Sequence, residues 1–426
     1  MSISNSLYVG VSGLQAHGEA ISVVSDNIAN ASTIGYKRER ASFSDMLGSQ
    51  LDSQRMGGGA RIEQSQMMWD QGTITQTGNP LDLAINGGGL FIVNGSHGGQ
   101  AGQFYTRDGR FHMDDTGYIT DQAGLRLQGF SINGAGVRAL SAGDLKLGGS
   151  QSPPVASTKS SMTLNLDANA KVPAAWDPAN PNTTSNYATS ETVYDSVGNS
   201  HHVDVYFRNQ GNGAWEYHAM VDGGQLTGGT AGTPTEITSG SLTFNTNGTL
   251  QAQSQNATPI NFLNATGGQN IAFSFGDDIA SGGTGLAGAT QYAGNSAVNG
   301  LDINGHAGGN LVDIAISDDG TITGKFDNGD KIALAQVALA AFNNEQGLTR
   351  TGDGLFTQSP TSGNPLIDAP GTGARGAVQS GALEQSNVDL GTELVTLIAY
   401  QRAFQANSKT VTTADEMLQV VDDLKR

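Results

Sequence analysis

Cysteine is absent from all 426 residues of this chain. The absence excludes disulfide bonds, metal sites built on thiolates and cysteine nucleophiles. Whatever the chain does, it must use other side chains.

Charge is also scarce, at 14% of residues, where a soluble domain carries about 25%. The 39 acidic and 21 basic side chains give a net charge of −18, which argues against nucleic acid or an anionic membrane surface as a partner. Glycine, by contrast, supplies 60 residues, which suggests many turns and tight backbone packing.

Long apolar runs are missing too. No stretch approaches the roughly 20 apolar residues of a membrane span. The start of the chain, MSISNSLYVGVSGLQAHGEA, lacks the basic segment and apolar core of a cleaved signal peptide. This favours the cytoplasm, whereas low charge, no cysteine and abundant Asn, Thr and Gly are typical of an exported surface protein. Export without a cleaved signal peptide would reconcile the two.

The chain does carry the same apolar pattern at both ends. Apolar side chains recur every seven residues at Leu7, Leu14, Ile21 and Ile28, and again at Leu383, Leu390, Leu397, Phe404, Val411 and Leu418, with Leu394 beside them. This spacing predicts a helix at each end. Gly10, Gly13 and Gly18 interrupt the first helix, each costing about 1 kcal/mol relative to alanine. We therefore expect that helix to need a partner.

We call each of these seven-residue repeats an apolar ladder. On each predicted helix, the neighbouring row of residues, offset from the ladder by three or four positions, is mostly polar, so both apolar stripes are narrow. A two-stranded coiled coil needs both rows to be apolar. The pattern favours packing among helices of neighbouring subunits, with a helical hairpin inside one chain as the alternative. The second helix is expected to have Ser386 or Asn387 as its N-cap, to carry Asp389 in its first turn and to run to Leu424.

Between the ends, short apolar runs alternate with turn dipeptides, which predicts antiparallel hairpins. Residues 264–310 are rich in glycine and are expected to hold little regular structure. The predicted fold is mainly β with α-helical termini, in nested domains. These are a terminal helical assembly domain in which the two helices pair (1–32 and 380–426), a connecting segment (33–70 and 365–379), a middle β domain (71–147 and 305–364) and an outer β domain (148–304).

Candidate chemical sites are weak. His201 and His202 with Asp204 suggest a metal site, but neighbours on a strand point to opposite faces. The acidic turns at 318–320 and 327–330 lack the spacing and the closing Glu of a calcium loop. The glycine triplets at 57–59 and 87–89 are followed by no Lys-Ser/Thr pair, so they are not phosphate loops. We predict no catalytic, cofactor-binding or metal-binding residues.

SDNIANASTIGYKRERASF is similar to the N-terminal signature of the rod and hook proteins of the bacterial flagellar axis, and SGALEQSNVDLGTELVTLIAYQRAFQANSKTVTTADEML is similar to their C-terminal signature. TQTGNPLDLAINGGGLFIV and YTRDGRFHMDDTGYITDQAGLRLQGF resemble their core β domain. YDSVGNSHHVDVYFR, WEYHAMVDG and LTFNTNGTL resemble the additional outer domain of hook members, which the shorter rod proteins lack.

The resemblance implies an extracellular structural subunit of the hook in the flagellar basal body. Such a subunit is exported without a cleaved signal by the flagellar type III apparatus and polymerises into a curved tube. The tube acts as a universal joint that passes motor torque from rod to filament. The implied partners are copies of itself, rod and hook–filament junction proteins, the hook cap and the export apparatus, with no nucleic acid, membrane or cofactor. The ladder residues would form the assembly interface.

Three other functions remain to be weighed. A distal rod protein is the nearest, although the outer domain argues against it. A secreted β-rich adhesin leaves the helical termini without a purpose, and an enzyme lacks any placed catalytic set.

Overall fold

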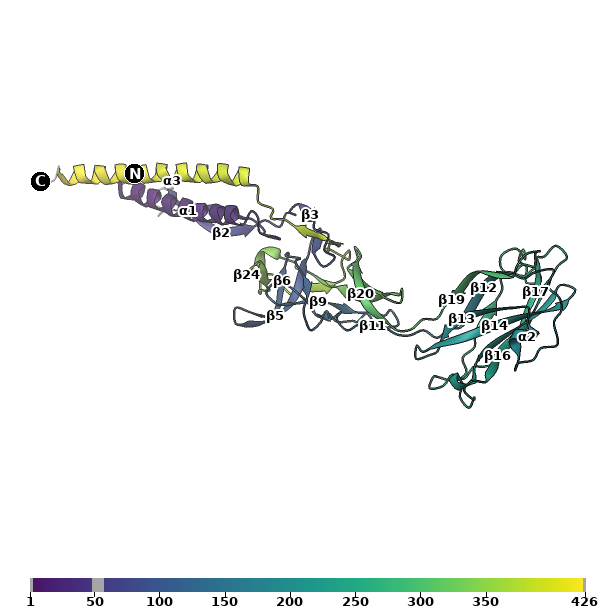
Figure 1. Cartoon of the computed structure of the whole chain (residues 1–426). Helices are drawn as coiled ribbons and strands as arrows, with labels where there is room; N and C mark the ends of the chain where they lie inside the picture. Colours follow the sequence, from purple (N-terminus) through teal and green to yellow (C-terminus); the bar gives the residue numbers. More distant parts are fainter. Residues whose placement is uncertain (1–2, 48–56, 424–426) are drawn as a thin grey trace. The chain divides into compact units, whose positions relative to one another are not determined.

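The computed structural model describes residues 3–47 and 57–423, in which the chain forms two compact units (Figure 1). The first unit comprises Met1–Gly149, Asp313–Lys325 and Lys331–Arg426, and the second comprises Ser150–Val312 and Phe326–Asp330. The second unit is thus an insertion over residues 150–312, where we predicted 148–304, joined by the short segment 326–330. The terminal helices and the middle β domain, predicted as separate domains, belong to one unit.

The two ends of the chain form a helical pair, as predicted. Helices α1 (Ile3–Ala29) and α3 (Leu390–Asp423) lie side by side and run antiparallel, purple and yellow in Figure 1. None of the helices in the described ranges is long and apolar enough to span a membrane.

The predicted N-cap of α3 was wrong by two or three residues. The cap is Asp389, whose Oδ1 accepts the backbone N–H of Gly391 at 2.8 Å and of Thr392 at 3.3 Å. These bonds hold the pKa of Asp389 below its usual value. Asn387 instead joins two connecting segments, because it accepts from the Arg38 backbone N–H at 2.7 Å and donates to the Met68 carbonyl at 2.8 Å.

The connecting segment after α1 forms a hairpin that the sequence did not reveal. Strands β1 (Glu39–Leu47) and β2 (Gly57–Met67) pair antiparallel and both contact α1. Phe43 of β1 lies 5.2 Å from His17 of α1 and 5.8 Å from Tyr400 of α3, measured between ring centroids. The hairpin therefore supplies packing that the glycine-containing helix lacks alone.

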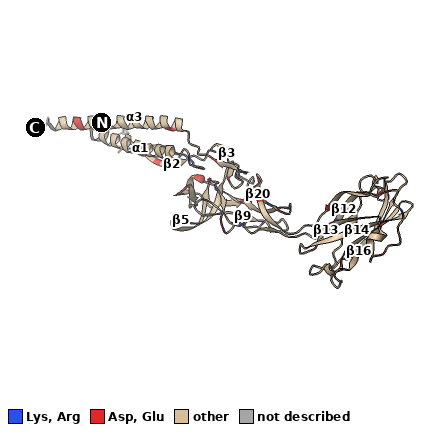
Figure 2. Cartoon of the chain, in the orientation of Figure 1, with Lys and Arg blue, Asp and Glu red and all other residues tan. Residues whose placement is uncertain are grey.

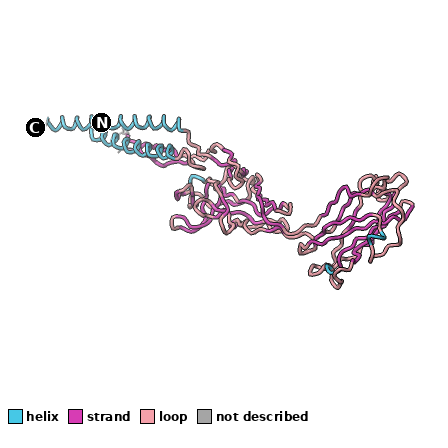
Figure 3. Tube along the Cα trace, viewed as in Figure 1, coloured by secondary structure: helices cyan, strands magenta, loops and turns pink. Residues whose placement is uncertain are grey.

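The rest of the first unit is built on strands (Figure 3), and the pairs within its main sheet are antiparallel. The sheet runs in the order β21-β22-β9-β5-β6-β25-β24. The strands before the insertion are β3 (Ile74–Gln76), β4 (Leu83–Asn86), β5 (Leu90–His97), β6 (Gln100–Thr106), β7 (His112–Met113), β8 (Ile119–Thr120), β9 (Arg126–Ser131) and β10 (Gly143–Asp144). Those after it are β20 (Gly309–Ile316), β21 (Thr321–Phe326), β22 (Lys331–Val337), β23 (Leu339–Ala341), β24 (Thr349–Gly352), β25 (Leu355–Thr357), β26 (Leu366–Asp368), β27 (Ala377–Ser380) and β28 (Ala382–Glu384), with the 3-10 turn η2 (Glu345–Gly347).

This sheet is buried on both faces. Phe91 and Val93 of β5 belong to one apolar cluster, whereas Leu90 and Ile92 belong to another. Successive side chains of a strand point to opposite faces, so β5 divides its residues between two cores.

The second unit has its own core between two sheets. A five-stranded antiparallel sheet, β13-β14-β15-β16-β17, and a three-stranded sheet, β18-β12-β19, contribute to one cluster. The elements are β11 (Gln151–Ser152), β12 (Lys159–Asn165), α2 (Pro181–Thr184), β13 (Tyr187–Tyr194), β14 (Ser200–Gly211), β15 (Ala214–Asp222), η1 (Gly223–Gln225), β16 (Pro234–Phe244), β17 (Leu250–Asn256), β18 (Ala272–Ser274) and β19 (Ala297–Ile303).

The expectation of little structure over 264–310 was wrong. Strands β18 and β19 fall in this range, and Phe273 and Phe275 are 6% and 1% exposed in the core. Two aromatic side chains bury enough apolar surface to order a glycine-rich segment. Composition hid them because glycine dominates the turns on either side.

Glu191 on β13 is a buried carboxyl group. It is 3% exposed, and its Oε2 accepts from Ser160 Oγ at 2.5 Å. Burial raises the pKa of Glu191 to about 7, and the Ser160 hydrogen bond offsets part of this effect.

We expect the second unit to lose stability as the pH rises from 4.5 to about 7, and to change little from this cause outside that window. A carboxyl group whose pKa is raised in the folded state holds its proton more tightly in the folded than in the unfolded protein. Its contribution to the free energy of unfolding is therefore complete below its pKa in the unfolded state. That contribution is lost as the pH rises through its pKa in the folded state. The loss should be roughly 3 kcal/mol. Denaturant unfolding followed by tryptophan fluorescence from pH 4 to pH 8 measures it. Glu191→Gln should flatten the profile, and an unchanged profile in that variant would contradict the assignment.

Candidate assembly interface

Small residues let the two terminal helices approach closely. A Cβ added to Gly10 would lie 2.9 Å from Val411 Cγ2, and one added to Gly13 would lie 2.7 Å from Asn407 Nδ2. Ala16 and Ala20 of α1 are also buried, at 2% and 0% exposure. Gly10 and Gly13, predicted only as interruptions of the helix, thus mark its contact face with α3.

A buried asparagine sets the register at the other end of the pair. Asn27 of α1 is 0% exposed. Its Nδ2 donates to Glu393 Oε2 of α3 at 3.2 Å and to the Glu39 carbonyl of β1 at 2.7 Å, while its Oδ1 accepts the Glu39 N–H at 2.9 Å. Any slip of α1 along α3 would leave these polar groups buried without partners, which is costly.

The chain covers its own apolar ladders only in part. Leu390 and Leu394 are each 49% exposed, and Phe404 is 39% exposed. The remaining ladder residues of the helices are partly exposed as well, namely Leu7, Leu14, Ile21, Ile28, Leu397, Val411 and Leu418. Both the helical hairpin and an uncovered apolar stripe are therefore present in one molecule.

Helix geometry explains the incomplete cover. A seven-residue repeat on a straight helix of 3.6 residues per turn drifts by about 20° per heptad. The ladder of α3 therefore cannot face α1 along its whole length. Val411 of this ladder lies beside Gly10 of α1, whereas Leu390, three heptads earlier on the same ladder, is half exposed.

Leu383 was wrongly placed on the helical ladder. It lies in β28, is 7% exposed and pairs with Thr75 of β3. The heptad spacing at this position is a coincidence, because α3 begins only at Leu390. The Leu383 side chain is already buried by contacts within its own chain, so we exclude it from the candidate assembly interface.

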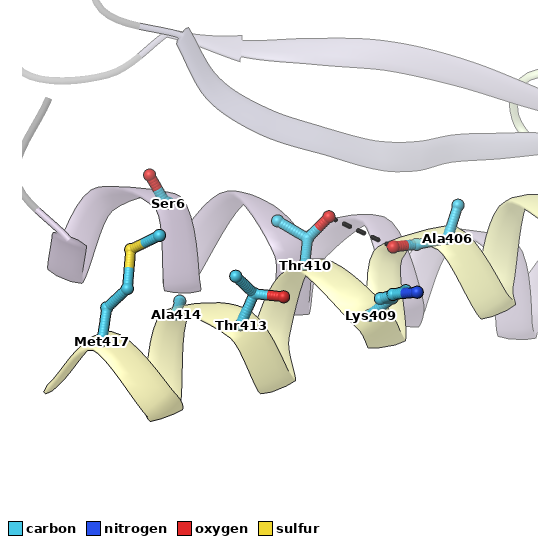
Figure 4. A pocket seen from close by; sticks show the side chains of 7 residues that line it. All are labelled: Ser6, Ala406, Lys409, Thr410, Thr413, Ala414 and Met417. Carbon is cyan, nitrogen blue, oxygen red and sulfur yellow. Dashed lines mark hydrogen bonds between the residues drawn. The ribbon is translucent and has the colours of Figure 1, made fainter. Parts of the chain in front are cut away.

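An open groove runs along α3 beside the start of α1 (Figure 4). It has a volume of about 500 Å³ and is lined from α1 by Ser6 and from α3 by Ala406, Lys409, Thr410, Thr413, Ala414 and Met417. The side chain of Met417 is 53% exposed. Three of the seven lining residues are apolar, namely Ala406, Ala414 and Met417.

Three charged residues form a buried cluster where the helical pair joins the β sheet. Glu384 Oε1 accepts from Lys37 Nζ at 2.7 Å, and its Oε2 accepts from Arg107 Nη1 at 2.9 Å. Their side chains are at most 4% exposed. Charged side chains are sparse along the chain (Figure 2), so two cations and one anion buried together are unusual.

This cluster ties together five segments of the sequence. Lys37 also donates to the Asp70 carbonyl at 2.8 Å, and Arg107 Nη2 donates to the Gly87 carbonyl at 2.7 Å. Gly35, at φ +68°, passes so close that an added Cβ would lie 2.6 Å from the Arg107 carbonyl carbon. Burial and then Arg107 lower the pKa of Lys37, and Glu384 offsets part of this effect.

The sequence reading missed this cluster. Lys37, Arg107 and Glu384 lie in the N-terminal, core and C-terminal stretches quoted above, and each is a charged residue in a chain with few. Their pairing spans 347 and 277 positions, so no local pattern could reveal it.

The paired histidines are not brought together as ligands. His201 is 6% exposed, with Nε2 3.1 Å from Asp195 Oδ2 and Nδ1 2.9 Å from Gln225 Oε1, and its ring stacks on Phe262. The His202 side chain is 61% exposed and lies 3.6 Å from Asp204. Over residues 3–47 and 57–423 no three His, Asp or Glu side chains are grouped as a metal site would need.

The chain is similar to flagellar axial proteins along its whole length. Four family models match: "Flagella basal body rod protein" at 7–37, "Flagellar hook protein FlgE/F/G D1 domain" at 84–171, "Flagellar basal body protein FlaE D2 domain" at 165–306, and "Flagellar basal body rod FlgEFG protein C-terminal" at 379–424.

Three full-length relatives carry the description "Flagellar hook protein FlgE". The protein from Escherichia coli (strain K12) is 32% identical over 422 residues, covering 97% of this chain and 98% of that one. The protein from Salmonella typhimurium is 30% identical over 419 residues, with the same shares. The protein from Brucella suis biovar 1 is 30% identical over 430 residues, covering 100% of both chains.

Glu384→Gln should destabilise the first unit by roughly 3–5 kcal/mol, because it leaves the Lys37 and Arg107 cations buried without their shared anion. Chemical denaturation followed by circular dichroism measures this loss. Asp313→Asn is the matched control, since its partner Lys325 and Asp313 are 46% and 50% exposed and such pairs contribute at most about 1 kcal/mol. Equal losses in the two variants would mean that the cluster does not hold the unit together.

Gly10→Ala and Gly18→Ala should act in opposite directions on the helical pair. Alanine at Gly18 meets no atom nearer than 3.9 Å and should gain up to about 1 kcal/mol of helix stability. Alanine at Gly10 meets Val411 and should lose about 1 kcal/mol or more. Thermal melting of the free subunit, followed by its helical circular dichroism, distinguishes the two variants. A higher melting temperature in both variants would rule out close packing at Gly10.

Proposed function

The chain belongs to the flagellar hook protein family, and we propose that its copies polymerise through α1 and α3 into the tube of the hook. It is a structural subunit of the bacterial flagellar hook. The observation that carries the proposed assembly role is that the helical pair leaves apolar side chains uncovered along its length.

The exposed apolar surface of α3 supports this role. Leu390, Leu394 and Ile398 are each 49% exposed at one end, and Met417 and Val420 are 53% and 58% exposed at the other. Covering one such half-exposed side chain in a polymer contributes about 0.7–1.5 kcal/mol, half of the gain for a fully exposed one. The contacts between neighbouring subunits would therefore come chiefly from this helix.

The two units suit a joint that resists twisting and permits bending. Helices of neighbouring copies packed along their apolar faces form a continuous layer that resists torsion. The second unit has a separate core, so it can shift against its neighbours without opening the helical layer. Low charge and many polar side chains favour water-mediated contacts that re-form at low cost as the tube bends. The polymer would thus act as a universal joint that carries torque from rod to filament.

We also propose the partners and location that the sequence analysis expected. The subunit works with other components of the flagellum. Its direct partners would be further copies of itself, rod and hook–filament junction proteins, the hook cap and the type III export apparatus. The polymer would lie outside the cell, after export without a cleaved signal peptide, and would contact neither nucleic acid nor membrane.

Electron microscopy of the purified subunit tests the assembly. Curved tubes are expected for a hook subunit, whereas straight rods would indicate a rod protein. Particles that never polymerise under any condition would sink the proposal.

Leu394→Asp should block polymerisation while the free subunit stays folded. The side chain is 49% exposed, so aspartate costs the monomer little, but in the polymer it would bury an unpaired carboxylate. Sedimentation of polymer measures the block, with an expected rise of about tenfold or more in the concentration needed for assembly.

Leu140→Asp is the matched control. Leu140 is fully exposed on the loop between β9 and β10 of the first unit. This variant should polymerise normally, and normal assembly of Leu394→Asp would remove α3 from the interface.

A further inference from the structure

A second groove lies on the other side of α1 from α3, between α1 and the β1–β2 hairpin. It has a volume of about 320 Å³. Its α1 wall includes Tyr8, Val11, Gln15 and Glu19, and its hairpin wall includes Met46 and Arg61. Tyr8 and Val11 are 72% and 46% exposed, so the apolar part of the groove is open. Glu19 closes one end, and no cation of the described residues forms an ion pair with it.

Helix α3 carries a ridge of matching form. Leu390, Leu394, Ile398 and Arg402 follow one another at intervals of four residues and are all exposed. Rows with this spacing form the ridges that pack between the rows of another helix. Arg402 ends the ridge, and it has no carboxylate within ion-pair distance in the described part of the chain.

The two surfaces match in spacing, and Glu19 offers a carboxylate at the position where Arg402 would lie, although Arg61 lines the same groove. On α1, Val11, Gln15 and Glu19 form a row of the same kind, with the apolar residue first and the anion eight residues later. On α3, Leu394 precedes Arg402 by the same eight residues. Laid parallel, the rows bring Leu394 to Val11 and Arg402 to Glu19. Their crossing would be of the kind in which rows four residues apart interdigitate, at about −50°.

Resting on the proposed polymerisation, we propose that the α3 ridge of one subunit docks in the α1–hairpin groove of another copy, with Arg402 paired to Glu19. One chain cannot make this contact with itself. Its own α1 and α3 run antiparallel, with Gly10 against Val411 and Asn27 against Glu393.

The contact also has the symmetry that a tube requires. Ridge and groove are different surfaces, so a bound pair still presents one free ridge and one free groove to further copies. Contacts of this head-to-tail kind extend into open helical polymers when the rotation between copies does not close a ring, whereas a self-complementary patch closes into a dimer.

Charge reversal with rescue tests the pairing. Glu19→Arg and Arg402→Glu should each raise the concentration needed for assembly by about tenfold, because each places like charges together. The double variant restores the pair with opposite sign and should assemble within about threefold of the unmodified chain. Circular dichroism of the free variants checks that they remain folded.

Lys171→Glu is the control for net charge, since it makes the same change as Arg402→Glu at an exposed site of the second unit. It should assemble normally. Failure of the double variant to recover, or normal assembly of both single variants, would overturn the pairing while the unmodified chain still forms tubes. Failure of the unmodified chain to form tubes would instead overturn the proposed function.

Discussion

The first unit depends on one buried carboxylate. Glu384 bridges Lys37, which follows α1, and Arg107, which leads out of β6, and Glu384 itself lies shortly before α3. Two cations buried in this place are tolerated only because the anion and nearby carbonyl oxygens satisfy them. The ends of the chain are thereby held at one point of the β sheet. The end of α1 is thereby held beside the start of α3, where Asn27 donates to Glu393.

The helical pair serves two requirements that conflict. A stable free subunit would cover its apolar ladders, and a polymer needs them uncovered. Glycines at positions 10 and 13 let the helices meet on a face of small residues, and Asn27 fixes their register. The larger residues Leu390 and Leu394 are left on the surface. Contacts within the chain and the proposed contacts between copies would therefore use different residues of the same two helices.

Sequence reasoning found the elements whose cause is local. The terminal helices follow from heptad spacing, and the β hairpins follow from alternating residues and glycine turns. It failed where contacts over long sequence distances decide the outcome. Leu383 fits the heptad but belongs to β28, because its pairing with Thr75 orders a strand there. Phe273 and Phe275 order a segment whose composition indicates a loop, because the core of the second unit receives them.

The sequence by itself determined the family, the mainly β fold with helical ends, and the absence of any cysteine chemistry, since these rest on composition, short-range periodicity and long contiguous motifs. Tertiary structure alone decided which face of each terminal helix is used within the chain. It also decided that Lys37, Arg107 and Glu384 share one site. A sequence gives the order of residues along the chain, whereas an ion pair or a helix contact depends on distance in space, and only the folded backbone relates the two.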